Sequence, residues 1–103
     1  MLSIDGFVTL LGEERATAIL RTQEREIARS AMQAAIRGGF RIVEFTLTVP
    51  GAFDLIEEFA SLPGIVVGAG TVLSVEEARE AVRRGASFLV SPVTDEAVIQ
   101  EAN

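Results

Sequence analysis

A glutamate lies in the middle of an apolar segment of this chain, where an ionisable side chain is unusual. Glu44 stands between Ile42-Val43 and Phe45, and the segment from about residue 41 to 47 has the composition of a β-strand. Strands of parallel sheets are normally apolar on both faces. A carboxyl group in such a dry position has a raised pKa, which suits a general base. The alternative is a structural carboxylate paired with an arginine, for which Arg21 is the candidate.

Other groups that could bind a ligand follow the remaining apolar segments. Arg21 ends the first one and is either a solvated loop residue or a clamp for a carboxylate or phosphate. The third segment ends in Gly-Ala-Gly-Thr at 68–71, which lacks the third glycine of a dinucleotide-binding motif. Its glycines would let a ligand approach the backbone, and Thr71 offers a hydroxyl and an N–H ahead of a helix. We interpret Ser91, after the fourth segment, as part of a strand-to-helix turn.

A repeated strand–helix unit must position these groups. Apolar segments recur at 16–21, 41–47, 65–68 and 87–91, and helix-like stretches lie between them at about 23–37, 50–62 and 74–84. A short helix is also expected at 3–14, and another begins after Thr94. Crossovers of this kind give parallel strands, and the C-terminal ends of such strands meet at one rim, where the chemistry lies. A leucine-rich solenoid is disfavoured because its Leu/Asn consensus is missing.

Periodicity within each element predicts its buried face. Alternation along the second strand places Val43 and Phe45 on one face and Glu44, Thr46 and Thr48 on the other. Pro50 is expected to begin a helix, Ser74 and Glu77 to form a capping box, and glycines at 38–39 and 85 to end helices. The residues expected to pack on the sheet are Ile27, Ala31, Ala34 and Ala35 in the first helix, Phe53, Ile56 and Phe59 in the second, and Ala78, Ala81 and Val82 in the third.

Composition excludes several classes of function. The 103 residues are 49% hydrophobic and 23% charged, which predicts one folded domain over 1–103 rather than disorder. A net charge of −6 argues against nucleic-acid binding, and no apolar run reaches the roughly 18 residues of a membrane span. The absence of cysteine fits the cytoplasm. Histidine is also absent, so acid–base chemistry near neutral pH falls to a carboxyl group with a raised pKa or to water.

Four segments together resemble the 2-keto-3-deoxy-6-phosphogluconate / 4-hydroxy-2-oxoglutarate (KDPG/KHG) aldolases, which are lyases with an α/β fold, the TIM (β/α)8 barrel. The segments are AILR at 18–21, GGFRIVEFTLTVP at 38–50, VVGAGTV at 66–72 and GASFLVSP at 85–92. They occur in the family's order and cover nearly the whole chain. The resemblance implies that these residues are the first four βα units of a barrel, and we expect the chain to be the N-terminal half of a protein roughly twice as long.

The resemblance also implies a reaction. Members of that family cleave an aldol through a lysine Schiff base and release pyruvate, without a metal or other cofactor, while a glutamate on the second strand shuttles protons. Glu44 would be that catalytic residue. Arg21 would orient anionic groups of the 2-keto acid substrate, and Thr71 would bind the pyruvate carboxylate.

Three more positions would contribute to substrate binding by the same resemblance. Gly70 would be one of the substrate-binding residues, and Pro92 would help line the pocket. Some members carry an arginine where this chain has Thr48, so the preferred keto acid stays open. A homotrimer in the cytoplasm is the family expectation.

The main departure from the family concerns the amine. The family's Schiff-base lysine lies on the sixth strand, whereas this sequence contains no lysine and predicts four strands. We therefore expect these 103 residues to lack aldolase activity alone. Four strands of a barrel would also leave two edges unpaired. Two alternatives remain: a metal-independent sugar-phosphate epimerase-type barrel, and a non-catalytic half-barrel that self-associates.

Overall fold

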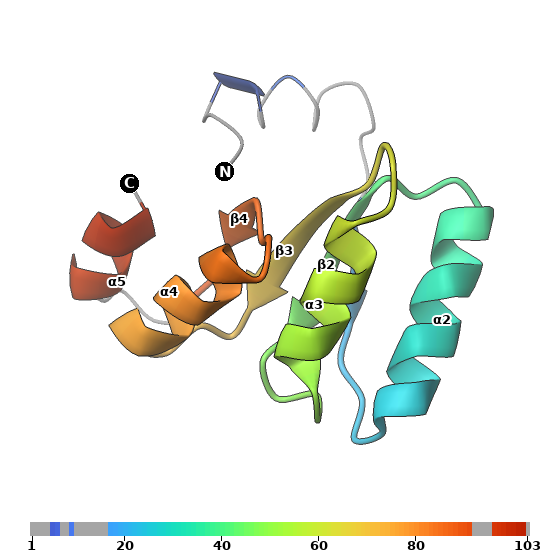
Figure 1. Ribbon diagram of the computed structural model, residues 1–103, viewed down its shortest axis with the longest axis horizontal. Helices are drawn as coiled ribbons and strands as arrows, with labels where there is room; N and C mark the ends of the chain where they lie inside the picture. Colours follow the sequence, from blue (N-terminus) through green and yellow to red (C-terminus); the bar gives the residue numbers. More distant parts are fainter. Residues whose placement is uncertain (1–4, 7–8, 10–16, 92–95, 103) are drawn as a thin grey trace.

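Four parallel strands form one sheet in the order of the chain (Figure 1). The computed structural model describes residues 5–6, 9, 17–91 and 96–102. The strands are β1 (Ala18–Leu20), β2 (Ile42–Thr46), β3 (Val66–Gly70) and β4 (Phe88–Leu89). Helices α2 (Arg25–Arg37), α3 (Ala52–Ala60) and α4 (Val75–Arg83) connect successive strands, and α5 (Glu96–Ala102) follows β4. The predicted repeat is confirmed over these residues, and the order is that of consecutive units in the wall of a β/α barrel.

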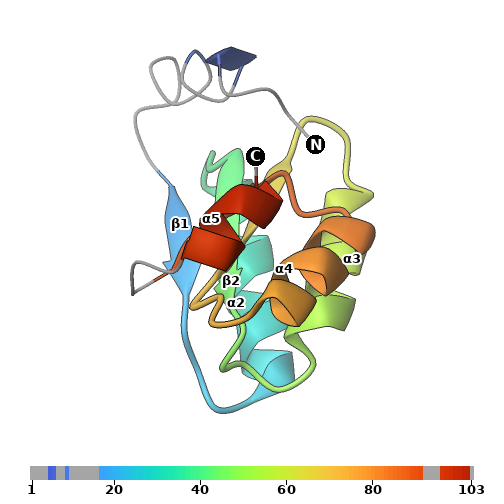
Figure 2. The same ribbon diagram turned by 90° about the vertical axis from the view of Figure 1, so that its left-hand side faces the viewer.

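The three connecting helices lie side by side on one face of the sheet (Figures 1 and 2). The core lies between these two layers, where Val43 and Phe45 of β2 and Val67 and Ala69 of β3 meet buried residues of the helices. The ring of Phe45 packs against Phe59 of α3, with centroids 5.1 Å apart. The alternation predicted for β2 is therefore confirmed: its odd-numbered residues face the helices, and Glu44 and Thr46 face the opposite side.

Helix α2 packs through a different stripe from the predicted one, which was Ile27, Ala31, Ala34 and Ala35. Of these four, Ala35 is partly buried against the core, whereas Ala31 and Ala34 are exposed and Ile27 is 52% exposed. The fully buried residues are Ala28 and Met32. The predicted stripe is wrong by one position because alanine suits a buried and an exposed face equally well. A run of alanines therefore does not fix the rotation of a helix, and the longer Met32 decides it by filling the core.

Helices α3 and α4 pack largely as predicted. Buried residues that were expected are Ile56, Phe59, Ala78 and Ala81, and Phe53 is half-buried. Val82 is 37% exposed, so its predicted packing is wrong. Helix α4 contacts the core through its two small alanines, which leaves Val82 at the margin of the interface.

The ends of the helices follow the predicted chemistry with two differences. The N–H of Glu77 donates to Oγ of Ser74 at 3.1 Å, but the Glu77 carboxylate accepts from the N–H of Leu73 rather than from Ser74. Helix α3 begins at Ala52 and not at Pro50, because Gly51 has a φ of +73° that a right-handed helix cannot contain. The described part of the chain has no helix long and apolar enough to cross a membrane.

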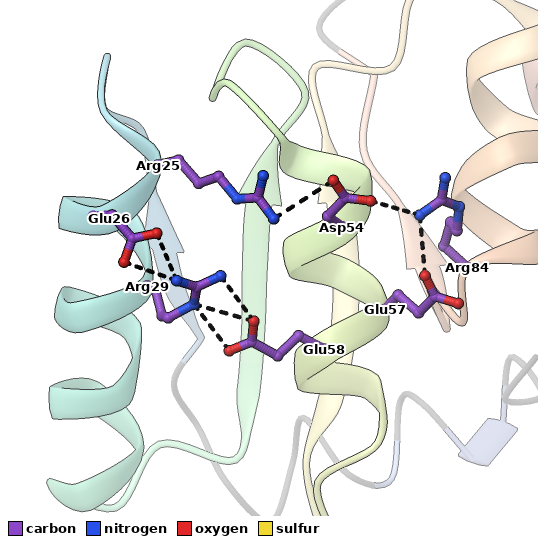
Figure 3. A network of polar contacts seen from close by, with 7 residues as sticks. All are labelled: Arg25, Glu26, Arg29, Asp54, Glu57, Glu58 and Arg84. Atoms are coloured by element: carbon purple, nitrogen blue, oxygen red, sulfur yellow. Dashed lines mark hydrogen bonds and ion pairs between the residues drawn. The ribbon is translucent and has the colours of Figure 1, made fainter.

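Ion pairs join the solvent-facing sides of the helices (Figure 3). Arg29 of α2 contacts Glu58 of α3 at 3.1 Å. Arg84, at the end of α4, contacts Asp54 and Glu57 of α3 at 2.9 and 3.0 Å. Asp54 also contacts Arg25 of α2 at 3.5 Å, so α3 is linked to both of its neighbours. The guanidinium group suits this role because its fork of donors can serve two carboxylates at once.

Candidate active site

Polar side chains gather at the C-terminal ends of the strands, on the side of the sheet away from α2, α3 and α4. Glu44 lies within β2 and pairs in register with Ile19 of β1 and Gly68 of β3. Arg21 and Thr71 are the first residues after β1 and β3. A parallel sheet brings these ends together, as the sequence predicted.

The Glu44 side chain is buried without an opposite charge in contact with it. The residue is 5% exposed, and no residue in the described part of the chain makes a hydrogen bond or ion pair with its carboxyl group. Burial raises the pKa of Glu44 above its ordinary value, and the positive charge of Arg21 opposes this rise without cancelling it. The alternative that Glu44 is a structural partner of Arg21 is therefore not supported by the contacts. A raised pKa is what a proton-transferring carboxyl group needs.

Arg21 contacts the end of β3 instead. Its Nη2 donates to Oγ1 of Thr71 at 3.3 Å. Thr71 has a φ of +57°, the only positive φ of a non-glycine residue in the described ranges. A β-branched residue in the left-handed region costs on the order of 1–3 kcal/mol, and such residues concentrate at functional sites. A cation and a hydroxyl held next to each other can bind one carboxylate through charge and a hydrogen bond.

Gly70 provides the space that the Glu44 carboxyl group occupies. A methyl group on Gly70 would overlap Oε1 of Glu44 and would lie 3.0 Å from its Cδ. The sequence suggested that Gly70 lets a ligand approach the backbone. The structure gives this glycine a further reason, which is to let a neighbouring side chain cross β3.

Sequence reasoning missed a role for Thr46. This residue is 2% exposed, and its hydroxyl donates to the carbonyl of Leu20 at 3.5 Å. The Thr46 and Thr48 hydroxyls are 2.9 Å apart, so Thr48 donates to Thr46 when Thr46 donates to Leu20. This chain of hydroxyls fixes the position of Thr48 at the rim. The signal in the sequence was the alternation that places Thr46 and Thr48 on the face of Glu44.

The remaining site predictions are only partly covered by the structure. Pro92 lies outside the described residues, and Ser91 is half-buried at the end of the fourth unit. In the described ranges, no three His, Cys, Asp or Glu side chains are grouped so that they could hold a metal ion. The arrangement offers a carboxyl group that can exchange a proton, beside a cation and hydroxyls that can hold an anion.

The chain is similar to known proteins of one family. The model of the KDPG and KHG aldolase family matches residues 8–103. The chain is 40% identical over 65 residues to a 2-dehydro-3-deoxy-phosphogluconate aldolase of Zymomonas mobilis, covering 63% of this chain and 31% of that protein. It is 34% identical over 85 residues to the KHG/KDPG aldolase of Escherichia coli, covering 82% of this chain and 40% of that protein.

The fold agrees with solved structures of the same kind. The crystal structure of the 2-keto-3-deoxy-6-phosphogluconate aldolase of Zymomonas mobilis with 3-phosphoglycerate superposes with a TM-score of 0.83 at 28% identity, covering 97% of this chain and 48% of that one. The chain spans less than half the length of the curated relatives it matches. Because the family pattern runs through residues 8–103 and the strands follow the same path, the chain belongs to the KDPG and KHG aldolase family of carbon–carbon lyases.

Proposed function

We propose that the protein carrying these residues is a Schiff-base aldolase that releases pyruvate from 2-keto-3-deoxy-6-phosphogluconate or 4-hydroxy-2-oxoglutarate, with Glu44 as its general acid–base residue. The observation that carries the proposal is Glu44, a residue 5% exposed whose carboxyl group makes no hydrogen bond with a described residue and has a raised pKa. It lies near Arg21 and Thr71 at the rim where a 2-keto acid would bind.

Each group in the site has a place in this reaction. The amine that forms the Schiff base would come from a lysine outside these 103 residues, which contain none. Glu44 accepts the proton of the substrate C4 hydroxyl as the C3–C4 bond breaks and its electron pair moves toward the iminium nitrogen. The same carboxyl group then returns the proton to C3, which restores Glu44 and yields the Schiff base of pyruvate.

Binding of the substrate falls to the other rim residues. Arg21 and Thr71 hold the carboxylate next to the keto group, and Gly70 keeps the backbone of β3 close to it. Thr48 and Pro92 contact the part of the substrate that leaves as the aldehyde product. Thr48 would contact the substrate through its uncharged hydroxyl, which can donate and accept hydrogen bonds.

The test is the Glu44→Gln substitution in the natural polypeptide that contains these residues. We expect pyruvate release to fall by roughly 100-fold or more, because a glutamine cannot transfer the proton. Trapping of pyruvate on the protein by borohydride should persist, because the amine is untouched. Glu24→Gln is the matched control: Glu24 is exposed, and its side chain makes no hydrogen bond at the start of α2.

Two results would contradict the proposal. Near-normal pyruvate release by Glu44→Gln would remove Glu44 from the chemistry. Exchange of a substrate C–H proton without release of pyruvate by the unsubstituted protein would favour the epimerase-type alternative.

A cytoplasmic homotrimer is part of the same proposal and rests on family membership. Sedimentation of the natural polypeptide at the mass of three protomers would support it, and a monomer would refute it.

A further inference from the structure

Two glycines of β3 lie on the face of the sheet that carries Glu44, and a side chain from each neighbouring strand fills the space they leave. A methyl group on Gly68 would overlap Cε2 and Cζ of Phe88, from β4. A methyl group on Gly70 would overlap Oε1 of Glu44, from β2. Both side chains therefore lie over the backbone of β3, and a Cβ at either position would force one of them to move.

The spaces filled by the Phe88 ring and the Glu44 carboxyl group lie over two glycines of the same strand, on the same face. Positions two apart on a strand are separated by about 6.6 Å, so the two glycine spaces adjoin. Gly68 is also the register partner of both Glu44 and Phe88. The ring crosses β3 level with the Glu44 backbone, and the carboxyl group lies one step nearer the rim.

Ile42 is fully buried on the same face of β2, two positions before Glu44. The partner of Glu44 on β1, Ile19, is 63% exposed, so that side chain extends largely into solvent. Neither glycine of β3 has a side chain to contribute. Arg21 is the one charged group in the described ranges that affects Glu44, and a cation favours the charged carboxylate.

We propose that Phe88 is a positioning residue for Glu44: its ring, seated in the space left by Gly68, covers one side of the carboxyl group and keeps water from that side. The role of Glu44 in proton transfer rests on the proposed function, but the contact does not. Gly68 and Gly70 act as a pair in this arrangement. Gly68 leaves space for the Phe88 ring, and Gly70 leaves space for the Glu44 carboxyl group.

Titration of the Glu44 carboxyl carbon by NMR in the natural polypeptide tests this directly. In Phe88→Ala, we expect the pKa of Glu44 to move down toward its ordinary value because water replaces the ring. Gly68→Ala should move the pKa in the same direction, since the added methyl displaces the ring but leaves the space at Gly70 open. Leu89→Ala is the matched control, because Leu89 packs on the helix side of the same strand, and it should leave the pKa unchanged.

The proposal would be overturned if the pKa of Glu44 were the same in Phe88→Ala and Gly68→Ala as in the unsubstituted protein. If Phe88→Ala does not fold, Phe88→Leu keeps an apolar side chain with a shorter reach, and it should give a smaller downward shift.

A double-mutant cycle on unfolding gives an independent measurement. Gly68→Ala alone should lower the unfolding midpoint, because its methyl collides with the ring. In the Phe88→Ala background the same change should raise the midpoint, because alanine is the better strand residue once the ring is gone. If Gly68→Ala changed the unfolding midpoint equally with and without the Phe88 ring, the ring would not occupy the space at Gly68 in solution.

These measurements separate the two proposals. A pKa that responds to Phe88 in a protein that releases no pyruvate would leave the contact standing and refute the function. An active aldolase in which the pKa of Glu44 does not depend on Phe88 would support the proposed function and refute the positioning role of Phe88.

Discussion

At the scale of single residues, the main feature is a carboxyl group held where its charge is disfavoured. The sequence predicted this for Glu44 from its apolar neighbours, since a strand of that composition must be buried on both faces. It could not predict why Gly70 is glycine. That reason depends on which residue of β2 lies beside β3, and the register of two strands is not a local property of either one.

Glu44 should reduce the stability of the folded chain at neutral pH. Its pKa is raised by burial, so the folded state binds the proton more tightly than the unfolded state does. Stability from this group is therefore fully present below the ordinary glutamate pKa of about 4.3 and is lost as the pH rises through the folded-state pKa. We expect Glu44→Gln to increase the free energy of unfolding at pH 7, with the increase disappearing at about pH 4.

Urea unfolding of both proteins at the two pH values checks this. A loss of stability in Glu44→Gln at pH 7 would mean that attraction to Arg21 outweighs burial, contrary to the order of the two effects in the structure.

At the scale of elements, strands and helices were predictable to within a few residues, but the rotation of a helix was not. Large apolar residues specify a buried face, and α3 has enough of them. Helix α2 has several alanines and a single methionine, so its stripe could be placed correctly only from the packing around Met32.

Met32→Ala and Ile27→Ala distinguish the observed stripe from the one expected from sequence. Met32 is 1% exposed, and its truncation should cost about 2–5 kcal/mol by leaving a cavity in the core. Ile27 is 52% exposed, and its truncation should cost less than about 0.5 kcal/mol. Denaturant unfolding of the two variants measures the difference. A larger loss of stability in Ile27→Ala than in Met32→Ala would favour the predicted stripe over the observed one.

At the scale of the whole molecule, the repeated strand–helix unit was readable from the sequence, whereas the ion pairs between helices were not. The unit follows from the spacing of apolar segments. The contacts of Arg29 and Arg84 with α3 depend on how adjacent helices turn toward each other, which requires the packed sheet beneath them.

Arg84→Ala should lower the unfolding midpoint more than Arg83→Ala. Arg84 faces Asp54, Glu57 and Glu80. Its loss leaves a contact to Arg25 at Asp54 and to Arg83 at Glu80, and removes the cation that faces all three carboxylates. Arg83 pairs with Glu80 among the described residues, and its side chain is 70% exposed. The difference in unfolding midpoint between the two variants should narrow in high salt, because added ions screen the repulsion between the carboxylates. Thermal unfolding at low and high salt measures this, and a gap independent of salt would show that packing rather than charge holds the helices together.

The backbone of Thr71 sets stability and function against each other. Glycine or asparagine would adopt its φ of +57° more easily than threonine does. Repeated laboratory selection for heat resistance alone should therefore replace Thr71 early, and the survivors would lack the hydroxyl that Arg21 holds. By the proposed function, in which Thr71 binds the substrate carboxylate, selection for growth on the substrate should restore threonine at that position, at the expense of heat resistance.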